Sequence, residues 1–452
     1  MILKTRLFGK SYEFKDVKDV LAKSNEEKSG DFLAGIAAET TAERVAAKVV
    51  LSELTLNDLR NNPVISYETD EITRIIQDSV DENIFNTIKS KTIGEFREIL
   101  LASDDKYIKN IRNGLTSEMI AGVTKLMSNM DLVYASRKIE NLATCNTTIG
   151  RFGTFSSRLQ PNHTKDDIDG ITASLMEGLS YGIGDAVIGL NPVIDGVESV
   201  SAILKRFKDF MIEWNIPTQN CVLAHVTTQM EALKNNVPMD LMFQSLAGSE
   251  ISNNAFGINV KLMDEAYKLM KEKKSSIGNN FMYFETGQGS ELSSEGHNKA
   301  DQLTLEARCY GFAKRYNPFL VNTVVGFIGP EYLYDGRQVI RAGLEDHFMG
   351  KLTGLPMGVD VCYTNHMKAD QNDLENLAML LASANCTYFM GIPAGDDVML
   401  NYQTTSFHDI ATLREITGKP PISEFNKRME ELGIFSKGKL TNKAGDPSIF
   451  IK

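Results

Sequence analysis

One carboxylate stands where an apolar run gives way to a glycine-rich segment. Residues 279–290 read Asn-Asn-Phe-Met-Tyr-Phe-Glu-Thr-Gly-Gln-Gly-Ser, so the run stops at Glu285, and Gly287 and Gly289 follow. An apolar run this short, without helical spacing, predicts a buried strand. Enzymes built on parallel sheets keep their working groups where such strands end. Glu285 is therefore a candidate acid–base or binding group, although a glutamate that only caps a backbone amide would give the same pattern.

Seven other segments resemble this one, and they predict the elements that must position Glu285. The eight apolar or small-residue runs cover residues 147–156, 186–190, 221–226, 241–243, 281–284, 319–327, 359–363 and 386–392. Helical periodicity fills segments between them, as at residues 197–214, 255–274 and 370–384. Eight strands alternating with helices predict an α/β fold, a (β/α)8 TIM barrel. The competitor is an open doubly wound sheet, which would ordinarily carry a glycine fingerprint after its first strand; none stands there.

Polar residues gather where these runs end. Arg158 and Gln160 follow the first run, Asn191 follows the second, and Asp360 lies in the seventh. The carboxyl ends of the strands of a parallel barrel share one face, and barrel enzymes work on that face. The sequence therefore predicts that these four residues and Glu285 converge on one mouth.

The first 140 residues carry structural signals and no recognisable chemistry. Capping boxes at Thr40–Glu43 and Thr92–Glu95 predict helix starts, and Val45, Val49 and Leu54 are expected on the apolar side of the first of these helices. We expect residues 1–140 to form a helical region for packing or oligomer contacts. Residues 141–452 are expected to form the barrel with a helical C-terminal extension.

Composition narrows the class of protein. The 452 residues include 48 basic and 59 acidic side chains, for a net charge of −11, which argues against nucleic-acid binding. No apolar run is long enough to span a membrane, and the N-terminus lacks the apolar core of a signal peptide, so we expect a cytoplasmic protein. Five cysteines lack Cys-x-x-Cys spacing and six histidines lack common metal motifs.

The expected cluster of two carboxylates, one arginine and two amides contains no nucleophile with a base beside it. A glycosidase would need aromatic platforms beside its carboxylates, and the single tryptophan, Trp214, falls in a predicted helix. A metal hydrolase would need a group of histidine ligands. The cluster suits a small, cationic, hydroxylated substrate, and the reactive species would then come from a cofactor.

Longer stretches carry a family resemblance. Residues 157–163 read Ser-Arg-Leu-Gln-Pro-Asn-His, residues 283–290 read Tyr-Phe-Glu-Thr-Gly-Gln-Gly-Ser, and residues 182–192, 354–366 and 390–409 are equally distinctive. Over essentially its whole length the chain resembles the large subunits of ethanolamine ammonia-lyase, which depend on adenosylcobalamin. The resemblance independently implies a (β/α)8 barrel.

The resemblance implies a radical conversion of ethanolamine to acetaldehyde and ammonia. The cobalt–carbon bond breaks homolytically, the adenosyl radical takes a hydrogen from the carbinol carbon, and the substrate radical loses or migrates its amino group. By matching positions, Arg158 and Asn191 hold the hydroxyl group, whereas Gln160 and Asp360 meet the amino group. Glu285 reaches both ends as the acid–base centre. The residues implied for shielding the radical and for contacting cobalamin are Phe327 for the first role and Pro192, Gln244, Ser293 and Met399 for the second.

The resemblance also bears on partners. It implies a small subunit that completes the cobalamin site, self-association into a higher oligomer, a reactivating factor, and residence in a bacterial microcompartment in many members. The cobalt-ligating pattern Asp-x-His-x-x-Gly of other cobalamin enzymes is not matched, because residues 345–350 read Glu-Asp-His-Phe-Met-Gly. We therefore interpret His347 as structural. Two rival hypotheses remain: a cofactor-free barrel hydrolase using Glu285 and Asp360, and an inactive scaffold on a similar barrel.

Overall fold

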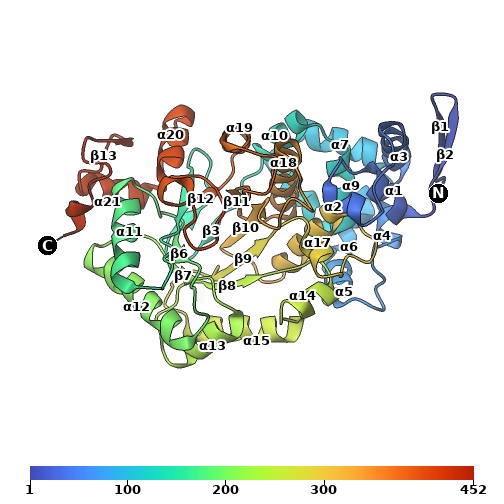
Figure 1. Ribbon diagram of the computed structural model, residues 1–452. Coiled ribbons are helices and arrows are strands. Elements are labelled where there is room, and N and C mark those ends of the chain that lie inside the picture. The colour runs from blue at the N-terminus through green and yellow to red at the C-terminus, as the bar shows by residue number, and fades with distance from the viewer. Residues whose placement is uncertain (452) are drawn as a thin grey trace.

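Eight parallel strands surrounded by helices form the centre of the molecule (Figure 1). The structure is a computed structural model and describes residues 1–451. The barrel strands are β5 (Ser156–Leu159), β6 (Val187–Leu190), β7 (Asn220–Val222), β8 (Met242–Ser245), β9 (Met282–Thr286), β10 (Leu320–Val325), β11 (Met357–Val361) and β12 (Tyr388–Gly391). Their order in the sheet is β7-β6-β5-β12-β11-β10-β9-β8, and every registered pair is parallel. The predicted TIM-like barrel is confirmed.

Asn220 and Asp240 hold together the two ends of this sheet, β7 and β8. The backbone N–H of Asn220 donates to Asp240 Oδ2 at 3.1 Å, and the Asp240 N–H donates to Asn220 Oδ1 at 2.8 Å. Leu241 N–H also donates to the Asn220 carbonyl at 3.2 Å. These bonds bring the edge strands together and nearly close the barrel.

The first barrel strand does not lie where the apolar pattern predicted it. Residues 147–156 contain the short strand β4 (Thr148–Ile149) and a turn, and β5 begins only at Ser156. The pattern failed because β5 is buried but polar. Ser157 points outward and donates to Asp185 Oδ1 at 2.8 Å, while Arg158 points into the barrel. Smaller shifts affect other strands: β8 and β9 extend through Ser245 and Thr286, and β10 ends before Phe327.

Helices cover the outside of the barrel. They are α11 (Ile168–Ser180), α12 (Val197–Glu213), α13 (Val226–Lys234), α14 (Glu250–Ala255), α15 (Val260–Lys273), α16 (Ser290–Ser293), α17 (Gln302–Lys314), α18 (Gly336–Thr353), α19 (Gln371–Ser383) and α20 (Phe407–Thr417). The helices predicted at residues 197–214 and 370–384 are confirmed. The segment predicted as one helix at 255–274 is the end of α14, a turn, and α15.

The N-terminal region is mainly helical, but it starts with a hairpin that the sequence did not indicate. Its elements are β1 (Lys4–Leu7), β2 (Lys10–Glu13), α1 (Val17–Ser24), α2 (Ser29–Leu33), α3 (Thr41–Glu53), α4 (Leu56–Asn61), α5 (Glu71–Asp78), α6 (Glu82–Ile88), α7 (Ile93–Ala102), α8 (Asp105–Ile111), η1 (Arg112–Gly114), α9 (Ser117–Lys125) and α10 (Asn129–Ser136), before the short β3 (Ala143–Thr144). The capping box at Thr92 is present. Thr40 caps α3, but the Glu43 carboxylate accepts from the Glu39 N–H.

The buried side of α3 differs from the prediction. Val45 and Val49 are exposed, whereas Val50 and Leu51 are buried together with Leu54. The buried side of the helix carries Ala46, Ala47, Val50 and Leu51. It faces inward because the two small alanines allow close packing there.

The N-terminal helices pack beside α17 and α18 (Figure 1). Arg308 of α17 joins the two parts, since its guanidinium lies 2.7 Å from Asp70 and 2.8 Å from Glu118, all three side chains being almost fully buried. One hydrophobic core runs through both parts. A division of the chain near residue 140 stays a prediction.

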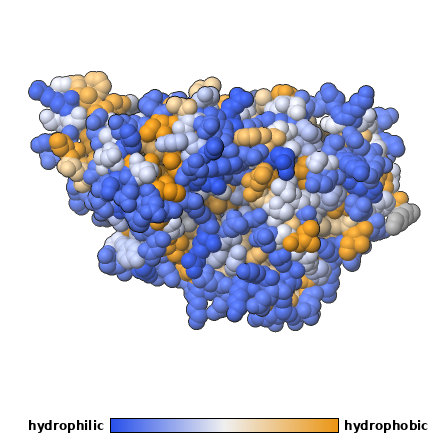
Figure 2. Space-filling view, turned by 180° about the vertical axis from the view of Figure 1, so that it is seen from behind, coloured by the Kyte–Doolittle hydropathy of each residue, from blue (hydrophilic) through white to orange (hydrophobic). Residues whose placement is uncertain are grey.

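The C-terminal extension is less helical than expected. It contains η2 (Pro393–Gly395) in the last barrel loop, then α21 (Ser423–Glu431), β13 (Phe435–Ser436), β14 (Lys439–Leu440) and η3 (Pro447–Phe450). The face in Figure 2 is mostly hydrophilic with separate hydrophobic patches. Among the helices of residues 1–451, none is both long and apolar enough to cross a membrane.

Candidate active site

Arg158 is the hub of the polar residues inside the barrel. It lies on β5 with only 1% of its surface exposed, and its Nη1 donates to Tyr283 Oη at 2.6 Å and to Glu285 Oε1 at 2.7 Å. Its Nη2 donates to Gln160 Oε1 and to Asn191 Oδ1, the latter at 3.2 Å. Burial disfavours the cation, but the oxygens of Tyr283 and Glu285 outweigh it and raise the pKa of Arg158 above its usual value. The guanidinium therefore stays charged and fixes three of the predicted residues around it.

Glu285 lies inside β9 and not beyond its end. Residues two apart on a strand share a face, so Tyr283 and Glu285 both point into the barrel, and Tyr283 Oη donates to Glu285 Oε1 at 2.8 Å. On the next strand Asn322 pairs in register with Glu285, and its Nδ2 lies 3.4 Å from the same oxygen. Arg158, Tyr283 and Asn322 all approach Oε1, which leaves Oε2 of this half-buried carboxylate available.

Gln160 and Asn191 are held through the last barrel loop. Asp397 Oδ2 accepts from Gln160 Nε2 at 2.7 Å and from Asn162 Nδ2 at 2.8 Å, and Asn162 Oδ1 accepts from the Asn191 N–H at 2.9 Å. The other oxygen, Oδ1, accepts from the N–H groups of Met399 and Leu400 at 2.9 and 2.6 Å. Asp397 thus orients the side-chain amides of Gln160 and Asn162 and shapes the loop, and Asn162 in turn holds the backbone of Asn191.

Asp360 on β11 lies in the same interior, but it does not bond directly to Arg158. Its Oδ2 accepts from Tyr402 Oη at 2.9 Å, and its Oδ1 accepts from Thr404 Oγ1. Burial raises the pKa of Asp360 to about 7, assisted by the negative charge of Glu285 and opposed by the two hydroxyl donors and by Arg158. The Tyr402 ring in turn packs edge-on against Phe327, at 5.2 Å between centroids.

The charges of this cluster do not balance. The hydrogen bonds described above involve one cation, Arg158. The carboxyl groups of Glu285, Asp360 and Asp397 surround it. A small cation at the free side of Glu285 would offset the excess, and ionised Asp360 would be stabilised by it. The arrangement is therefore suited to an ammonium group on a molecule that also offers an oxygen to Arg158 or Asn191.

A cavity of about 420 Å³ opens beside these residues at the carboxyl ends of the strands. Glu285 and Thr286 contribute to its wall, and Gln244 and Phe327, predicted from the resemblance, line it as well. Leu223, Phe243, Leu246 and Val324 make much of the remaining wall apolar. Gln244 is 4% exposed and accepts from the Val226 N–H at 3.0 Å, so its position is fixed. Phe327 is 37% exposed, with its ring packed against Tyr402.

The other residues predicted to contact the cofactor lie around this mouth at different depths. Pro192 is buried directly after Asn191, and half-buried Met399 is anchored by its N–H to Asp397. Ser293, at the end of α16, is exposed and donates to the Ser290 carbonyl at 2.7 Å. The role of these three residues in cofactor binding stays a prediction.

His347 lies in a helix, α18, as expected, and is fully buried. Burial lowers the pKa of its ring well below the usual value. Within residues 1–451 no group of three or more His, Cys, Asp or Glu side chains is arranged to hold a metal ion, and the five cysteines are buried and unpaired.

Four functional candidates escaped the sequence reasoning: Tyr283, Asn322, Asp397 and Tyr402. Signals for two of them were present. Tyr283 stands two positions before Glu285, so strand alternation places it on the same face, and Asn322 is a polar residue inside an apolar strand. Tyr402 and Asp397 belong to an irregular loop, whose path could not be derived from periodicity.

Comparisons with known proteins bear on the whole chain. The family described as Ethanolamine ammonia lyase large subunit (EutB) matches residues 12–443. The ethanolamine ammonia-lyase large subunits of Escherichia coli (strain K12) and Salmonella typhimurium (strain LT2) are each 57% identical over 453 residues, covering 100% of this chain and 100% of each relative. A solved structure of the hydrogenase maturase HydG covers 80% of this chain and 83% of its own, with a TM-score of 0.45 and 11% identity.

Proposed function

The chain belongs to the family of ethanolamine ammonia-lyase large subunits, which are carbon–nitrogen lyases, and we propose that it converts ethanolamine to acetaldehyde and ammonia by adenosylcobalamin-dependent radical chemistry. The observation that carries the proposal is the contact between Arg158 Nη1 and Glu285 Oε1, 2.7 Å apart inside the barrel. It places a cation and a carboxylate side by side, so a molecule as small as an amino alcohol can contact both.

Each end of ethanolamine has partners in this arrangement. Arg158 and Asn191 bind the hydroxyl group, and Gln160 and Asp360 bind the ammonium group. Glu285 reaches both ends of the substrate. Its Oε1 lies beside Arg158, which binds the hydroxyl group, while its Oε2 remains available. Charge-assisted hydrogen bonds of this kind are about twice as strong as neutral ones, so they orient a two-carbon substrate firmly.

Glu285 and Arg158 have different roles in the reaction, proton transfer and charge stabilisation. Glu285 Oε2 accepts a proton from the substrate and returns one to the leaving amine, while the fixed positive charge of Arg158 stabilises negative charge that develops on oxygen. No covalent bond to the protein is required. Phe327, whose ring packs against Tyr402, is the proposed apolar wall that shields the reacting groups from water.

The apolar wall of the cavity and its rim fit the apolar ring face of a large cofactor such as adenosylcobalamin. The cavity wall is largely apolar, and the loops after β6, β10 and β12 present exposed hydrophobic side chains, which are Val193, Ile194, Phe327 and Val398. Exposed apolar side chains gathered at one mouth indicate a binding surface. When bound, the cofactor supplies the radical that the residues of the chain cannot generate. Pro192, Gln244, Ser293 and Met399 are the proposed contacts, and His347 is assigned none, because its ring is fully buried in α18.

We further propose that a small subunit completes the cofactor site and that large subunits associate with one another. The family name "large subunit" supports the first point. The helical N-terminal region is our candidate for contacts between copies. A reactivating factor and residence within a microcompartment are further predictions from the family resemblance.

The decisive experiment measures acetaldehyde released from ethanolamine by the chain with and without the small subunit, and with and without adenosylcobalamin. Turnover is expected only when both are present. Release that is independent of adenosylcobalamin would contradict the radical mechanism, and robust turnover by the isolated chain would contradict the need for a small subunit. No aldehyde from the complete mixture, with correctly folded proteins, would favour the hydrolase hypothesis and would also agree with an inactive scaffold.

A further inference from the structure

A layer of buried polar groups lies behind Glu285, on the outer side of the sheet. Strand alternation turns Thr286 of β9 and Thr323 of β10 away from the barrel interior, towards the covering helices. Thr286 Oγ1 donates to Glu306 of α17, and Thr323 Oγ1 donates to Asp346 Oδ2 of α18 at 2.8 Å. Both carboxyl groups are fully buried. The interface between sheet and helices in a barrel is usually apolar, so carboxyl groups placed directly behind the catalytic strand call for an explanation.

Gln288 connects this layer to the loop that carries on from Glu285. It lies three residues after Glu285, between β9 and α16, and is 2% exposed. Its Nε2 donates to Asp346 Oδ1 at 2.6 Å and lies 3.4 Å from Glu345 Oε2, and its Oε1 accepts from Gln302 Nε2 at 3.4 Å. The loop at the mouth of the barrel is therefore fastened to α18 by a side chain that points away from the substrate.

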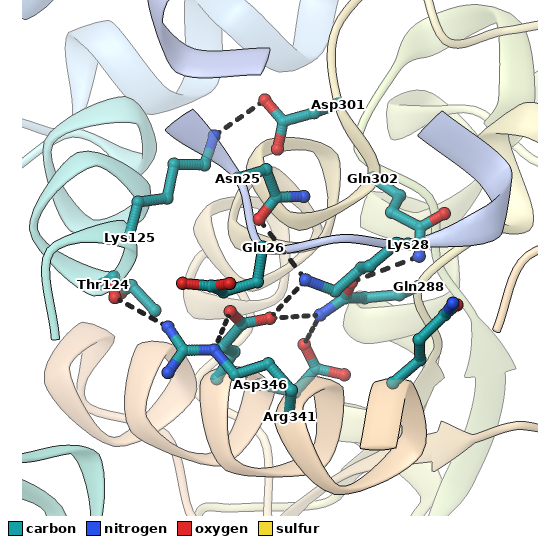
Figure 3. A network of polar contacts seen from close by, with 12 residues as sticks. Asn25, Glu26, Lys28, Thr124, Lys125, Gln288, Asp301, Gln302, Arg341 and Asp346 are labelled. Carbon is teal, nitrogen blue, oxygen red and sulfur yellow. Dashed lines mark hydrogen bonds and ion pairs between the residues drawn. The ribbon is translucent and has the colours of Figure 1, made fainter. Parts of the chain in front are cut away.

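The N-terminal region enters the same network through Lys28. Its Nζ lies 2.8 Å from Glu345 Oε2, and both side chains are fully buried. Arg341 Nε binds the other oxygen of Glu345 at 2.5 Å. In Figure 3, Lys28 and Lys125 come from the N-terminal region, whereas Gln288, Arg341 and Asp346 belong to the barrel. Lys28 and Arg341 hold the pKa of Glu345 at about 2 despite its burial, so this carboxylate remains charged.

The packing around Lys28 leaves the network little freedom. Two residues later, the Gly30 N–H donates to the Tyr332 carbonyl in the loop after β10, at 3.1 Å. A methyl group at Gly30 would come within 2.3 Å of Gln302 Oε1, and one at Gly289 would come within 2.6 Å of Tyr332 Cβ. The N-terminal segment and the loops after β9 and β10 therefore fit together in one arrangement.

Burying charges in this way is expensive. A buried ion pair contributes little net stability compared with apolar residues of the same size, but losing one partner typically costs about 3–5 kcal/mol. Such a network is best suited to fixing one geometry, because every donor and acceptor specifies a partner. We propose that Gln288 is a positioning residue for Glu285, and that Lys28 fixes Gln288 through Glu345, which both side chains contact. This inference rests on the proposed function of Glu285 and assigns the N-terminal segment a task within its own subunit.

The test compares four variants in the assembled enzyme, with the small subunit and adenosylcobalamin: Gln288→Leu, Asp346→Asn, Lys28→Met and, as a control, Lys351→Met. Lys351, like Lys28, is a buried lysine, and it lies on α18, the helix that carries Glu345 and Asp346. Its Nζ donates to the Asn385 carbonyl at 2.9 Å, and Asn385 precedes β12 at the opposite end of the barrel. Turnover gives kcat and KM. Calorimetry of ethanolamine binding to the complex carrying hydroxocobalamin gives an affinity without turnover, and thermal unfolding gives stability.

Gln288→Leu and Lys28→Met are each expected to lower kcat by about 10- to 100-fold, because small displacements of a catalytic group have effects of this size. The binding experiment should show a weaker affinity for ethanolamine. A further variant that combines Gln288→Leu with Lys28→Met should lose little more activity than either single variant. Asp346→Asn should stay within about 3-fold of the parent. The new amide keeps an oxygen for Gln288 and can donate an N–H to the Thr323 hydroxyl. Lys351→Met should change only the unfolding temperature.

The inference is overturned if Gln288→Leu shifts the unfolding temperature while leaving kcat, KM and affinity at parent values, or if Lys351→Met lowers kcat as much as Lys28→Met. Should Gln288→Leu fail to fold, Gln288→Asn keeps a polar amide but cannot span the distance to Asp346, and parent kinetics in that variant would also overturn it. Turnover by the parent enzyme tests the proposed function separately, since this inference depends only on ratios to an active parent.

Discussion

Arg158 and Glu285 are 127 residues apart in the chain, and Arg158 Nη1 lies 2.7 Å from Glu285 Oε1 across the inside of the barrel. The guanidinium is planar, so the bond from Nη1 to Glu285 also directs Nη2 towards Gln160 and Asn191. One side chain thereby sets the relative positions of groups from β5, β9 and the loop after β6.

The planar geometry of Arg158 predicts that a lysine cannot replace it. Arg158→Lys keeps the charge but cannot reach Glu285, Gln160 and Asn191 at once. We expect kcat/KM for ethanolamine to fall by about 100-fold, and by more for Arg158→Ala. Arg206→Lys on α12, where the Arg206 Nε donates to Thr172 Oγ1, is the matched control and should leave turnover unchanged. Parent-like kinetics in Arg158→Ala would refute the central role of this residue.

The hydroxyl of Tyr283 is expected to contribute to catalysis, because it donates to Glu285 Oε1 at 2.8 Å and accepts from Arg158 at 2.6 Å. Tyr283→Phe removes a hydrogen bond to a charged group, worth about 1.5–3 kcal/mol, so kcat should fall by about 10- to 100-fold. Tyr316→Phe removes a comparable bond to Asp264, 3.0 Å long and outside the site, and serves as control. Equal kinetics in the two variants would contradict the assignment.

The raised pKa of Asp360 predicts that ethanolamine binding releases a proton near neutral pH. Burial raises the pKa of Asp360 to about 7 in the free protein, so the carboxyl group is largely neutral below that pH. A bound ammonium group favours the ionised form and lowers this pKa, hence a proton leaves and KM rises as the pH falls below 7.

Calorimetry in buffers of different ionisation enthalpy measures that proton, with hydroxocobalamin in the complex to prevent turnover. Asp360→Asn should abolish the release and make the affinity independent of pH between about 6 and 8. Proton release of unchanged size in Asp360→Asn would assign the titration to another group.

The close packing of Gly289 against Tyr332 predicts that Gly289→Ala destabilises the protein more than Gly418→Ala. Both Gly289 and Gly418 have positive φ, at 104° and 65°, but a methyl group would meet Tyr332 Cβ at 2.6 Å only at Gly289. Gly418→Ala should lower the free energy of unfolding by about 1 kcal/mol through backbone strain, and Gly289→Ala by about 1–3 kcal/mol more through overpacking. Urea unfolding of the two variants measures the difference. Equal losses would show that the loop after β9 can yield to Tyr332.

The sequence predicted most of the barrel because its strands are short apolar runs separated by amphipathic helices. It misplaced β5, since Ser157 and Arg158 are buried polar residues whose partners, Asp185 and Glu285, lie far along the chain. It also missed the N-terminal hairpin, whose residues 4–13 are mostly polar and half-exposed. Hydrophobic periodicity reports which residues are removed from water, and it says little about polar residues buried by partners.

For the candidate site, the sequence alone determined which residue types end each strand, and the parallel arrangement of the barrel then required them to share one face. Only the tertiary structure decided that Arg158 bonds Tyr283, that Asp397 orients Gln160, and that Gln288 turns towards Asp346 of α18. Strand order and pleat follow from local patterns, whereas the choice of partner depends on which side chains long-range packing brings within hydrogen-bonding distance. That choice places Glu285 among three donors on one oxygen and leaves its other oxygen outside these bonds.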